Sequence, residues 1–488
     1  MKRDLAALAD TPFDVLVVGG GILGAGIARD AALRGLRVAL IDQEDFASGT
    51  SSRSTKLIHG GFRYLEQAAF GLVIEACRER RILQTIAPHL VQPRSFLLPV
   101  YRGEPRGLAA IRLGMTLYDL LAFYRNTAPH QSLSPEHTLT TEPQLARTGL
   151  RGAVLFHDCQ EDDARFCLEN VLHAADRGAV CANYCALIGF VARGNRLVAA
   201  QVADRAGTGT FEIRARVFVN AAGPWVERVA DLAPFNGRPV ALSATRGVHL
   251  LFPQFTTPHG VFFQARRDGR ILFVVPWHDC SIVGSTDTDF VGDPARARTG
   301  PADIDYLCEE ARAILPDTPI DESAILTTFA GVRPLLRSNA RATARSREHR
   351  LIRQGDNLLS VVGGKFTTYR AIAEQAVNRV YQLLGQSRPP CTTATTPLPV
   401  HRPPPGGESI APLPTIHASD IAHACDHEMA LTLTDVMRRR TSLALSRHAT
   451  PPVAERVARL MAPRLHWTEA QRAEQVRQYV QEWKRARP

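Results

Sequence analysis

Residues 13–42, FDVLVVGGGILGAGIARDAALRGLRVALID, join an apolar run, a glycine-rich turn, a helical segment and a second apolar run. The first run, Phe13–Val18, has the continuous hydrophobicity of a strand buried on both faces of a parallel sheet. The turn carries three glycines at the spacing of a dinucleotide-binding fingerprint: Gly19, Gly21 and Gly24. Asp42 ends the second run, where an acidic residue accepts a hydrogen bond from a ribose hydroxyl. These features predict a dinucleotide site without separating NAD from FAD.

Two later segments repeat the pattern of an apolar strand that enters a glycine turn. They are RVFVNAAGPWVERVA, residues 216–230, and NLLSVVGGKFTTYR, residues 357–370. A nucleotide fold that opens at residue 13 and returns near residue 360 contains a large insertion. We therefore expect a discontinuous domain around a cofactor as extended as FAD, with three unrelated strand–turn units as the alternative.

Size and charge limit the classes of protein to consider. A chain of 488 residues predicts two or three domains. The net charge of +10 comes almost entirely from arginine, which either reflects an arginine-rich genome or favours an anionic surface. No nucleic-acid-binding motif accompanies the charge, so no nucleic-acid partner is predicted.

Cysteine usage and hydropathy favour a cytoplasmic protein. The nine cysteines are scattered, and Cys181 and Cys185 have the wrong spacing for a redox or zinc motif, so we predict reduced thiols and no metal site. We expect no signal peptide, and the sequence contains no run of about 18 apolar residues. Any membrane contact is therefore expected to be peripheral.

Five motifs together resemble a known family. GGGILGAGIARDAALRGLRVALID, TSSRSTKLIHGGFRYLE, FVNAAGPWV, GVRP and GGKFTTYR occur in the order and spacing of the FAD-dependent glycerol-3-phosphate dehydrogenases. The resemblance covers residues 12–385 and is weaker in the C-terminal helices. It implies oxidation of sn-glycerol 3-phosphate to dihydroxyacetone phosphate, with hydride passing from substrate C2 to FAD and electrons on to a quinone at the membrane surface.

The resemblance also implies the fold: an α/β protein with a Rossmann-like, discontinuous FAD-binding domain, an α+β substrate-binding cap and an all-helical C-terminal domain. We expect the FAD-binding domain at 1–89, 152–236 and 331–385, and the cap at 90–151 and 237–330. Residues 386–408, rich in Pro, Thr and Gly, predict a linker, and 409–488 the helical domain. In that domain Ser419 and Thr468 are expected to cap helices, and Pro451 to begin one.

The same motifs imply the residues around the cofactor. Beside the fingerprint glycines and Asp42, the expected cofactor-binding residues are Thr50, Ser51, Ser52, Lys56, His59, Gly60, Gly61, Ala222, Gly223, Gly364, Lys365 and Thr367. Hydroxyls and backbone amides would hold phosphates or the ring, and glycines would let the backbone lie against the flavin.

A phosphorylated substrate needs cations, and an alcohol that loses hydride needs a base or a charge-stabilising group nearby. By the resemblance, Arg63, Arg333 and Lys365 supply the cations, Tyr64 closes the cavity, and His249 is the base or hydroxyl ligand. His59 is an alternative base. The chain has only four lysines, and both interior ones, Lys56 and Lys365, fall in these motifs. The arginines could instead be surface residues and His249 a core residue.

Three residues of the expected cap, Trp277, Thr286 and Asp287, are placed by the resemblance near the cavity mouth. The basic segment 337–353 is either a solvated loop or a patch for anionic lipid. The C-terminal tail is expected to serve stability or interaction, and a homodimer is among the expected assemblies.

Three competing functions remain open on sequence alone. One keeps the fold and acts on an amine or amino acid, which requires a carboxylate clamp in place of phosphate-directed cations. A second uses oxygen as the electron acceptor. The third is a catalytically silent FAD-binding protein, whose flavin no small alcohol or amine would reduce.

Overall fold

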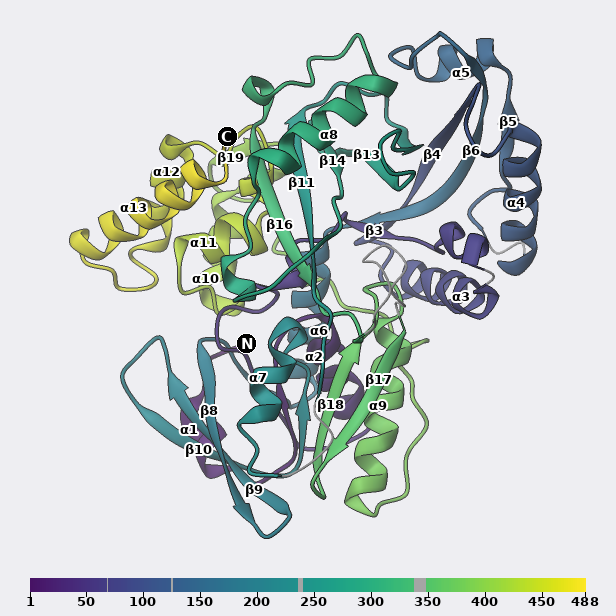
Figure 1. Ribbon diagram of the computed structural model, residues 1–488. Coiled ribbons are helices and arrows are strands. Elements are labelled where there is room, and N and C mark those ends of the chain that lie inside the picture. The colour runs from purple at the N-terminus through teal and green to yellow at the C-terminus, as the bar shows by residue number, and fades with distance from the viewer. Residues whose placement is uncertain (68, 124–125, 236–239, 338–347) are drawn as a thin grey trace.

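The stretch 13–42 forms strand β1 (Phe13–Val18), helix α2 (Ile22–Leu33) and strand β2 (Val38–Ile41). The computed structural model describes residues 1–67, 69–123, 126–235, 240–337 and 348–488, and within 62–67 it leaves the side chains of Arg63, Glu66 and Gln67 undescribed (Figure 1). Strand β1 is buried on both faces, as its unbroken hydrophobicity predicts.

Three segments that are far apart in sequence lie side by side in an eight-stranded sheet. Strand β10 (Thr210–Asn220) pairs in parallel with β1, and β18 (Leu358–Gly363) pairs in parallel with β10. The path runs β17-β18-β10-β1-β2-β7, and β9 joins β10 to β8. The other strands are β7 (Val180–Ala182), β8 (Cys185–Arg193), β9 (Arg196–Asp204) and β17 (His349–Gln354). The predicted discontinuous domain is confirmed.

Helices cover one face of this sheet. Helix α2 packs against both α6 (Asp163–Asp176) and α9 (Tyr369–Leu384), and their apolar side chains join Val15 and Val17 in one core. On the opposite face of β1, β2 and β10, apolar side chains pack against the hairpin of β8 and β9 and against the short helix α1 (Leu5–Asp10). Helix α7 (Val226–Asp231) follows the turn after β10. The glycine turns consequently emerge together at the carboxyl ends of β1, β10 and β18.

A second, ten-stranded sheet lies above the first in Figure 1. Its path is β15-β11-β14-β13-β12-β4-β6-β3, with β16 paired to β11 and β5 to β6. The strands are β3 (Leu57–Ile58), β4 (Val91–Tyr101), β5 (Gln131–Leu133), β6 (Leu150–Glu161), β11 (Thr245–Pro253), β12 (Gly260–Gln264), β13 (Ile271–Trp277), β14 (Cys280–Gly284), β15 (Thr288–Asp289) and β16 (Thr327–Arg333).

Two strands of this sheet extend across predicted domain boundaries. Strand β6 crosses 151/152 and β16 crosses 330/331, yet both pair within the ten-stranded sheet over their whole length. Their hydrophobicity suits a strand of either sheet, so only the pairing partners decide which sheet each joins.

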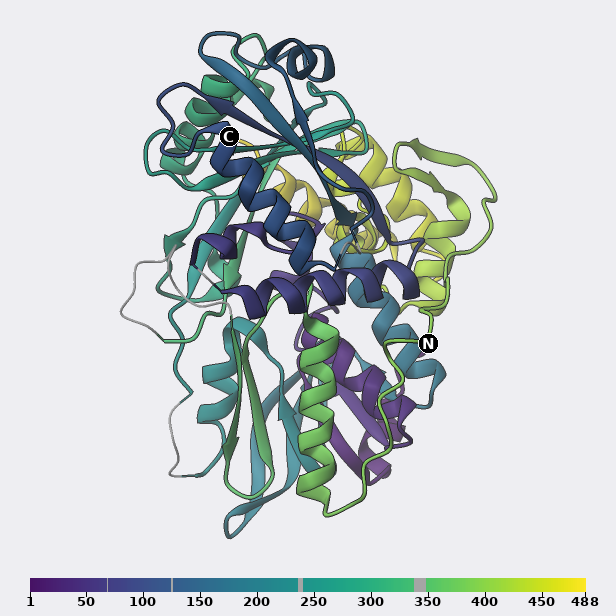
Figure 2. The same cartoon turned by 90° about the vertical axis from the view of Figure 1, so that its right-hand side faces the viewer.

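Helices pack on the ten-stranded sheet from several sides. Helix α8 (Pro301–Ile314) buries Ile304, Leu307 and Ala311 against it. Figure 2 shows α3 (Phe70–Ile86), in dark blue, between this sheet above and α9 below, and α4 (Leu108–Leu121) contacts both α3 and β6. Helix α5 (Pro135–Thr141) contacts β6. Among the described residues, no helix is long and apolar enough to cross a membrane.

The C-terminal part is a separate helical domain that begins with a small hairpin. Residues 386–408 contain no helix or strand, as their composition predicts. The hairpin β19 (Ser409–Pro412) and β20 (Thr415–His417) precedes the helices α10 (Ala418–His427), α11 (Leu433–Asp435), α12 (Pro451–Met461) and α13 (Glu469–Arg485), with a π-helical turn at Val436–Arg440.

The helix starts in this domain test three sequence predictions. Thr468 caps α13 by accepting from the Gln471 N–H at 3.2 Å, and Pro451 begins α12, both as predicted. The prediction that Ser419 caps a helix is wrong. His417 is the N-cap residue of α10, because Asp420 accepts from its backbone N–H at 2.8 Å, and Ser419 instead donates to the Pro404 carbonyl.

A buried ionic contact fixes this domain to the loop that follows β2. Asp45 accepts from Arg439 Nε at 2.5 Å and makes two bonds to Arg440, at 2.7 and 2.8 Å. The two guanidinium groups lower the pKa of the Asp45 carboxyl against the opposing effect of burial. The loop after β2 is therefore anchored to the C-terminal domain at Asp45.

Candidate active site

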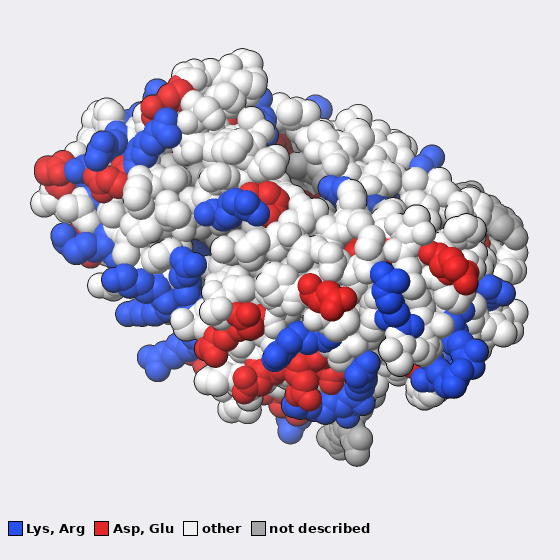
Figure 3. All heavy atoms as spheres, turned by 90° about the horizontal axis from the view of Figure 1, so that it is seen from above, with Lys and Arg blue, Asp and Glu red and all other residues white. Residues whose placement is uncertain are grey.

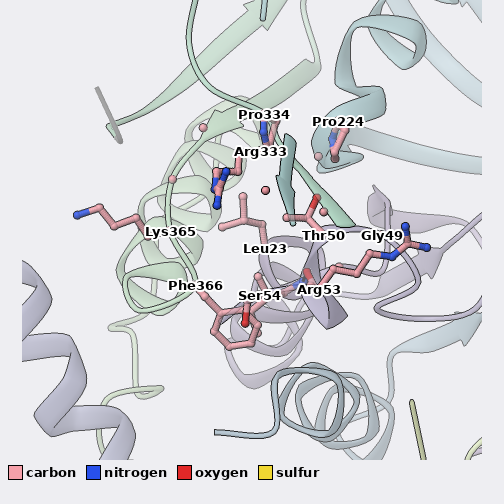
Figure 4. Close-up of a pocket in the computed structure, with 18 of the residues that line it drawn as sticks. Leu23, Gly49, Thr50, Arg53, Ser54, Pro224, Arg333, Pro334, Lys365 and Phe366 are labelled. Atoms are coloured by element: carbon pink, nitrogen blue, oxygen red, sulfur yellow. Dashed lines mark hydrogen bonds between the residues drawn. The ribbon is translucent and has the colours of Figure 1, made fainter. Parts of the chain in front are cut away.

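A cavity of about 520 Å³ lies where the carboxyl ends of β1, β10 and β18 meet the ten-stranded sheet. The eight-stranded, Rossmann-like sheet contributes the turns at Gly19, Ala222 and Gly364. The ten-stranded sheet, called the upper sheet below, contributes His249 and Arg333. In the view of Figure 4, Arg333 and Lys365 lie on one side of the cavity and Thr50, Gly49 and Arg53 on the other. One cavity thus spans both sheets.

The fingerprint glycines allow the first turn to pack without side chains. Gly19 has a φ of +108°, and a Cβ there would lie 2.6 Å from the Ala221 carbonyl oxygen. A Cβ at Gly24 would lie 1.8 Å from the Gly19 oxygen. Gly19 and Gly21 line the cavity, whereas Gly24 lies behind the turn, where it permits close packing of the helix.

Asp42 faces the glycine turn from the end of β2. Its Oδ2 accepts from the Gly20 N–H at 2.6 Å and its Oδ1 from the Glu44 N–H at 2.9 Å. Burial raises the pKa of Asp42 to about 7, against the lowering effect of these two bonds. The carboxyl group lines the cavity and can accept from a hydroxyl there.

The short helix Thr50–Ser52 connects the glycine turn to the upper sheet. Ser51 Oγ accepts from the Ile22 N–H at 2.9 Å, at the N-terminus of α2, and Thr50 Oγ1 donates to the Val332 carbonyl at 2.6 Å. Both residues line the cavity, and Ser52 is not among the lining residues. The hydroxyls of Thr50 and Ser51, which the resemblance assigns to the cofactor, therefore also join the two sheets.

Lys56 lies beneath the cavity and does not line it. Its Nζ is ion-paired with Asp163 at the N-terminus of α6 and lies 5.1 Å from the centre of the Trp277 ring. Ser54 Oγ donates to the same carboxylate at 2.7 Å. Lys56 thus stabilises the loop of residues 54–56 in which it lies.

Gly60 is also behind the wall of the cavity. Its N–H donates to Asp158 at 3.1 Å, and a Cβ there would lie 2.1 Å from the Tyr118 hydroxyl. His59, Gly61 and Tyr64 of the same stretch line the cavity. Arg63 belongs to the short helix Phe62–Gln67, but its side chain lies outside the described structure.

The turn after β18 brings Lys365 to the cavity wall. Its Nζ lies 3.6 Å from the centre of the Tyr64 ring, which is close enough for a cation–π contact. Thr367 also lines the cavity, and its Oγ1 accepts from the His59 N–H at 3.3 Å. The second glycine motif therefore meets the stretch 59–64.

Arg333 is held at the cavity edge by the segment after β14. Its Nη1 donates to Asp287 at 3.0 Å and its Nη2 to Ser285 Oγ at 2.8 Å. Asp287 lines the cavity, whereas Thr286 is buried against the Val248 N–H and Trp277 against Lys56. The guanidinium group is therefore positioned before any ligand binds.

His249 lies on β11, and it lines the cavity although its side chain is almost fully buried. Its Nε2 lies 2.9 Å from Thr55 Oγ1, and its ring stacks on Phe329 with centres 4.7 Å apart. Nδ1 has no hydrogen-bond partner within the described part of the chain. Burial, and then the positive charges of Arg333 and Lys56, lower the pKa of His249, so the imidazole is neutral at pH 7.

Several cavity residues were not predicted from the sequence. Thr55 orients His249, Ser285 holds Arg333, and Trp225 and Arg270 also line the cavity. Thr55 lies inside the motif TSSRSTKLIHGGFRYLE. Ser285 directly precedes Thr286 and Asp287, which the resemblance places near the cavity mouth. Arg270 had no distinguishing signal among 54 arginines.

Comparison with known proteins identifies the family. Residues 14–379 match the family described as FAD dependent oxidoreductase, and residues 392–472 match the C-terminal domain of alpha-glycerophosphate oxidase. Glycerol-3-phosphate dehydrogenase of Synechocystis sp. is 35% identical over 98% of this chain and 97% of its own length. The chain belongs to the family of FAD-dependent glycerol-3-phosphate dehydrogenases.

Other members of this family agree with that assignment. Aerobic glycerol-3-phosphate dehydrogenase of Staphylococcus epidermidis is 38% identical over 79% of this chain and 70% of its own. The solved glycerol-3-phosphate dehydrogenase of Bacillus halodurans, complexed with FAD, has a TM-score of 0.77 and 27% identity over 99% of this chain and 96% of its own. Glycine oxidase of Geobacillus kaustophilus, at 19% identity and a TM-score of 0.59, shows the fold alone.

FAD is the cofactor of this family, and the cavity fits it. The side-chain-free turn at Gly19 and the start of α2 suit a pyrophosphate, and Asp42 suits a ribose hydroxyl. Gly61 and Gly364, both with positive φ, line the wall near Lys365, where they leave room for a flat ring.

Proposed function

We propose that this enzyme oxidises sn-glycerol 3-phosphate to dihydroxyacetone phosphate and delivers the electrons to a quinone. The observation that carries the proposal is the convergence of Arg333, Lys365 and a neutral His249 on one cavity that fits FAD. FAD, when bound, supplies the acceptor for the hydride that leaves substrate C2. The protein must bind the phosphate, orient C2 and take up the hydroxyl proton.

Arg333 and Lys365 are proposed to bind the substrate phosphate and the oxygens next to it. The planar guanidinium group suits a phosphate because it donates two parallel hydrogen bonds, and Asp287 and Ser285 already hold it in place. Lys365 adds a compact positive charge beside Tyr64. Arg63 remains a proposal from sequence for the same role.

His249 is proposed as the group that accepts the C2 hydroxyl proton. A neutral imidazole can accept this proton, whereas an imidazolium cannot. Burial, and then the charges of Arg333 and Lys56, lower the pKa of His249, which keeps the ring in the neutral form that accepts a proton. His59 also lines the cavity and is the alternative.

The apolar face of α4 is proposed to contact the membrane that holds the quinone. Leu113, Leu117 and Leu120 follow helical spacing and are exposed, Leu113 by 72%, and Phe123 just beyond the helix is 65% exposed. Figure 3 shows basic and acidic side chains scattered among uncharged residues over the face seen from above. Of the basic segment 337–353, residues 338–347 lie outside the described structure.

The membrane proposal is tested by flotation with vesicles of phosphatidylglycerol and phosphatidylcholine. Leu113→Ser/Leu117→Ser should lose vesicle binding, because each serine removes apolar area from the lipid-facing surface. Val291→Ser is the matched control, since Val291 is 97% exposed and lies outside α4. Equal flotation of all three proteins would refute a role for α4.

The reaction itself is tested by mixing the anaerobic yellow protein with sn-glycerol 3-phosphate and recording flavin absorbance. Rapid bleaching is expected with the phosphate ester and not with glycerol or amino acids. Adding a water-soluble quinone or oxygen to the reduced enzyme then identifies the acceptor by the faster reoxidation. Bleaching by an amino acid, or by nothing, would refute the proposed substrate.

A further inference from the structure

A second cavity, of about 560 Å³, lies between the C-terminal domain and the loop 43–53. Its other walls come from residues 293–299, β16 and the end of α13. It adjoins the first cavity, which fits FAD and is called the flavin cavity here. The wall between the two cavities includes Gly49, where a Cβ would lie 3.1 Å from the Trp225 ring. This cavity plays no part in the reaction proposed above.

Arginine dominates the lining of the second cavity. Seven arginines line it: Arg53, Arg205, Arg228, Arg298, Arg438, Arg439 and Arg485. Four carboxylates do so: Glu44, Asp45, Asp293 and Glu482. Each carboxylate already has an arginine partner, in the pairs Arg205–Glu44 at 2.7 Å, Arg439–Asp45 at 2.5 Å, Arg228–Asp293 at 3.5 Å and Arg438–Glu482 at 3.7 Å. The lining therefore has an excess of positive charge.

Two of these arginines have only backbone partners within the described part of the chain. Arg53 Nη1 donates to the Ala330 carbonyl at 3.2 Å, and Arg298 Nη1 donates to the Ala297 carbonyl at 2.8 Å. Burial, and then the charges of Arg438, Arg298 and Arg439, lower the pKa of Arg53 to about 10. Like charges are therefore close enough to repel one another in this cavity.

Buried polar atoms at the same place lack hydrogen-bond partners. Among the described residues, Arg438 Nε and Thr299 Oγ1 are both buried with no hydrogen bond, and both residues line the cavity. Arg438 Nε is 3.7 Å from Glu482, which is an ion pair but not a hydrogen bond. A buried donor that makes no hydrogen bond costs stability, so these atoms favour a ligand that brings acceptor oxygens into the cavity.

We propose that this second cavity binds a phosphate group, held by Arg53, Arg298 and Arg438 between the C-terminal domain and the loop 43–53. A phosphate offers several acceptor oxygens and negative charge, which match guanidinium donors and relieve their repulsion. Arg53 lines both cavities, and the same loop carries Thr50 and Ser51 at the flavin cavity. Phosphate in the second cavity would thus restrain a loop of the cofactor site.

The test is calorimetric titration of the full-length holoenzyme with inorganic phosphate, at constant ionic strength set by chloride. Arg333→Gln removes one of the cations proposed for the substrate phosphate and so weakens that site, which makes the second cavity the larger contributor to the phosphate binding that remains. In that background Arg438→Gln should weaken phosphate binding by roughly ten- to one-hundredfold, through loss of a charge-assisted contact. Arg477→Gln is the matched control on α13, because Arg477 is exposed, pairs with Glu474 and is not among the lining residues.

Thermal unfolding gives a second readout that does not depend on catalysis. In the Arg333→Gln background, phosphate should raise the unfolding temperature with or without Arg477→Gln, and should raise it less when Arg438→Gln is added. The same titration with phosphatidylglycerol vesicles separates a free phosphate from a lipid headgroup. Equal phosphate affinity with and without Arg438 would overturn the proposal, as would absence of binding in Arg333→Gln. A failed substrate proposal would look different: Arg333→Gln and wild type would bind equal amounts of phosphate.

Discussion

Lys56 and Lys365, the two interior lysines, hold their positive charges in opposite settings. Lys56 is buried beneath the flavin cavity and is ion-paired with Asp163. Lys365 lines the cavity and lies over the Tyr64 ring. The comparison teaches that a charge buried in an ion pair beneath the cavity supports the fold, whereas a charge at the cavity wall lies where a ligand would bind. Substitutions at the two sites should therefore separate stability from activity.

The largest effect is expected from Lys56→Met. It leaves the Asp163 carboxylate buried without its cation, which typically costs about 3–5 kcal/mol of unfolding free energy. Denaturant unfolding of the holoenzyme measures this loss. Lys484→Met, which removes an exposed lysine, should change stability by less than about 0.5 kcal/mol. Adding Asp163→Asn should recover part of the loss, and a stable single variant would end the assignment of Lys56 to the fold.

Lys365→Met should leave the fold nearly unchanged and impair the reaction. Loss of a positive charge that contacts the substrate should lower kcat/KM for glycerol 3-phosphate by roughly 100-fold, or about 2.7 kcal/mol. Anaerobic flavin reduction measures this effect, and denaturant unfolding serves as the control. If kcat/KM matched the wild type, Lys365 would have no role toward substrate.

Asp287→Asn tests a third setting for a positive charge. Arg333 lies at the cavity wall, like Lys365, but Asp287 holds it in place. The asparagine keeps the shape but weakens the 3.0 Å contact to Arg333 Nη1, so the guanidinium group should be less well placed. We expect a fall of roughly tenfold in kcat/KM, or about 1.4 kcal/mol. The fall should appear mainly in KM, and an unchanged KM would show that Arg333 needs no such support.

His249 provides the smallest effect, a pH dependence of stability. Its pKa is lowered in the folded protein, so below its ordinary value of about 6.5 the unfolded chain binds more protons than the folded one. Stability should therefore fall as the pH decreases below about 6.5, by at most about 1.4 kcal/mol per pH unit from this group. His249→Asn should flatten that part of the pH profile, and an unchanged slope would assign it to other groups.

Much of the site could be predicted because its residues lie in contiguous motifs. The residues that were named from sequence and that line the cavity include Gly19, Gly21, Asp42, Tyr64, His249, Arg333 and Lys365. Their assigned roles stay predictions until the variants are measured. Ser52, Lys56 and Gly60 lie in the same motifs but do not line the cavity, because neighbours in a loop alternate between facing a ligand and facing the fold.

The sequence by itself determined the nucleotide fold, because the fingerprint depends on residues close together in the chain, and the five motifs taken together indicated FAD. Only the tertiary structure decided which interior lysine meets Asp163 and which meets Tyr64. It likewise joined Asp45 to Arg440, 395 positions away, and gathered the arginines of the second cavity from several distant segments. The physical reason is that a charge acquires its role from partners a few ångströms away, and chain folding, not sequence distance, sets those partners.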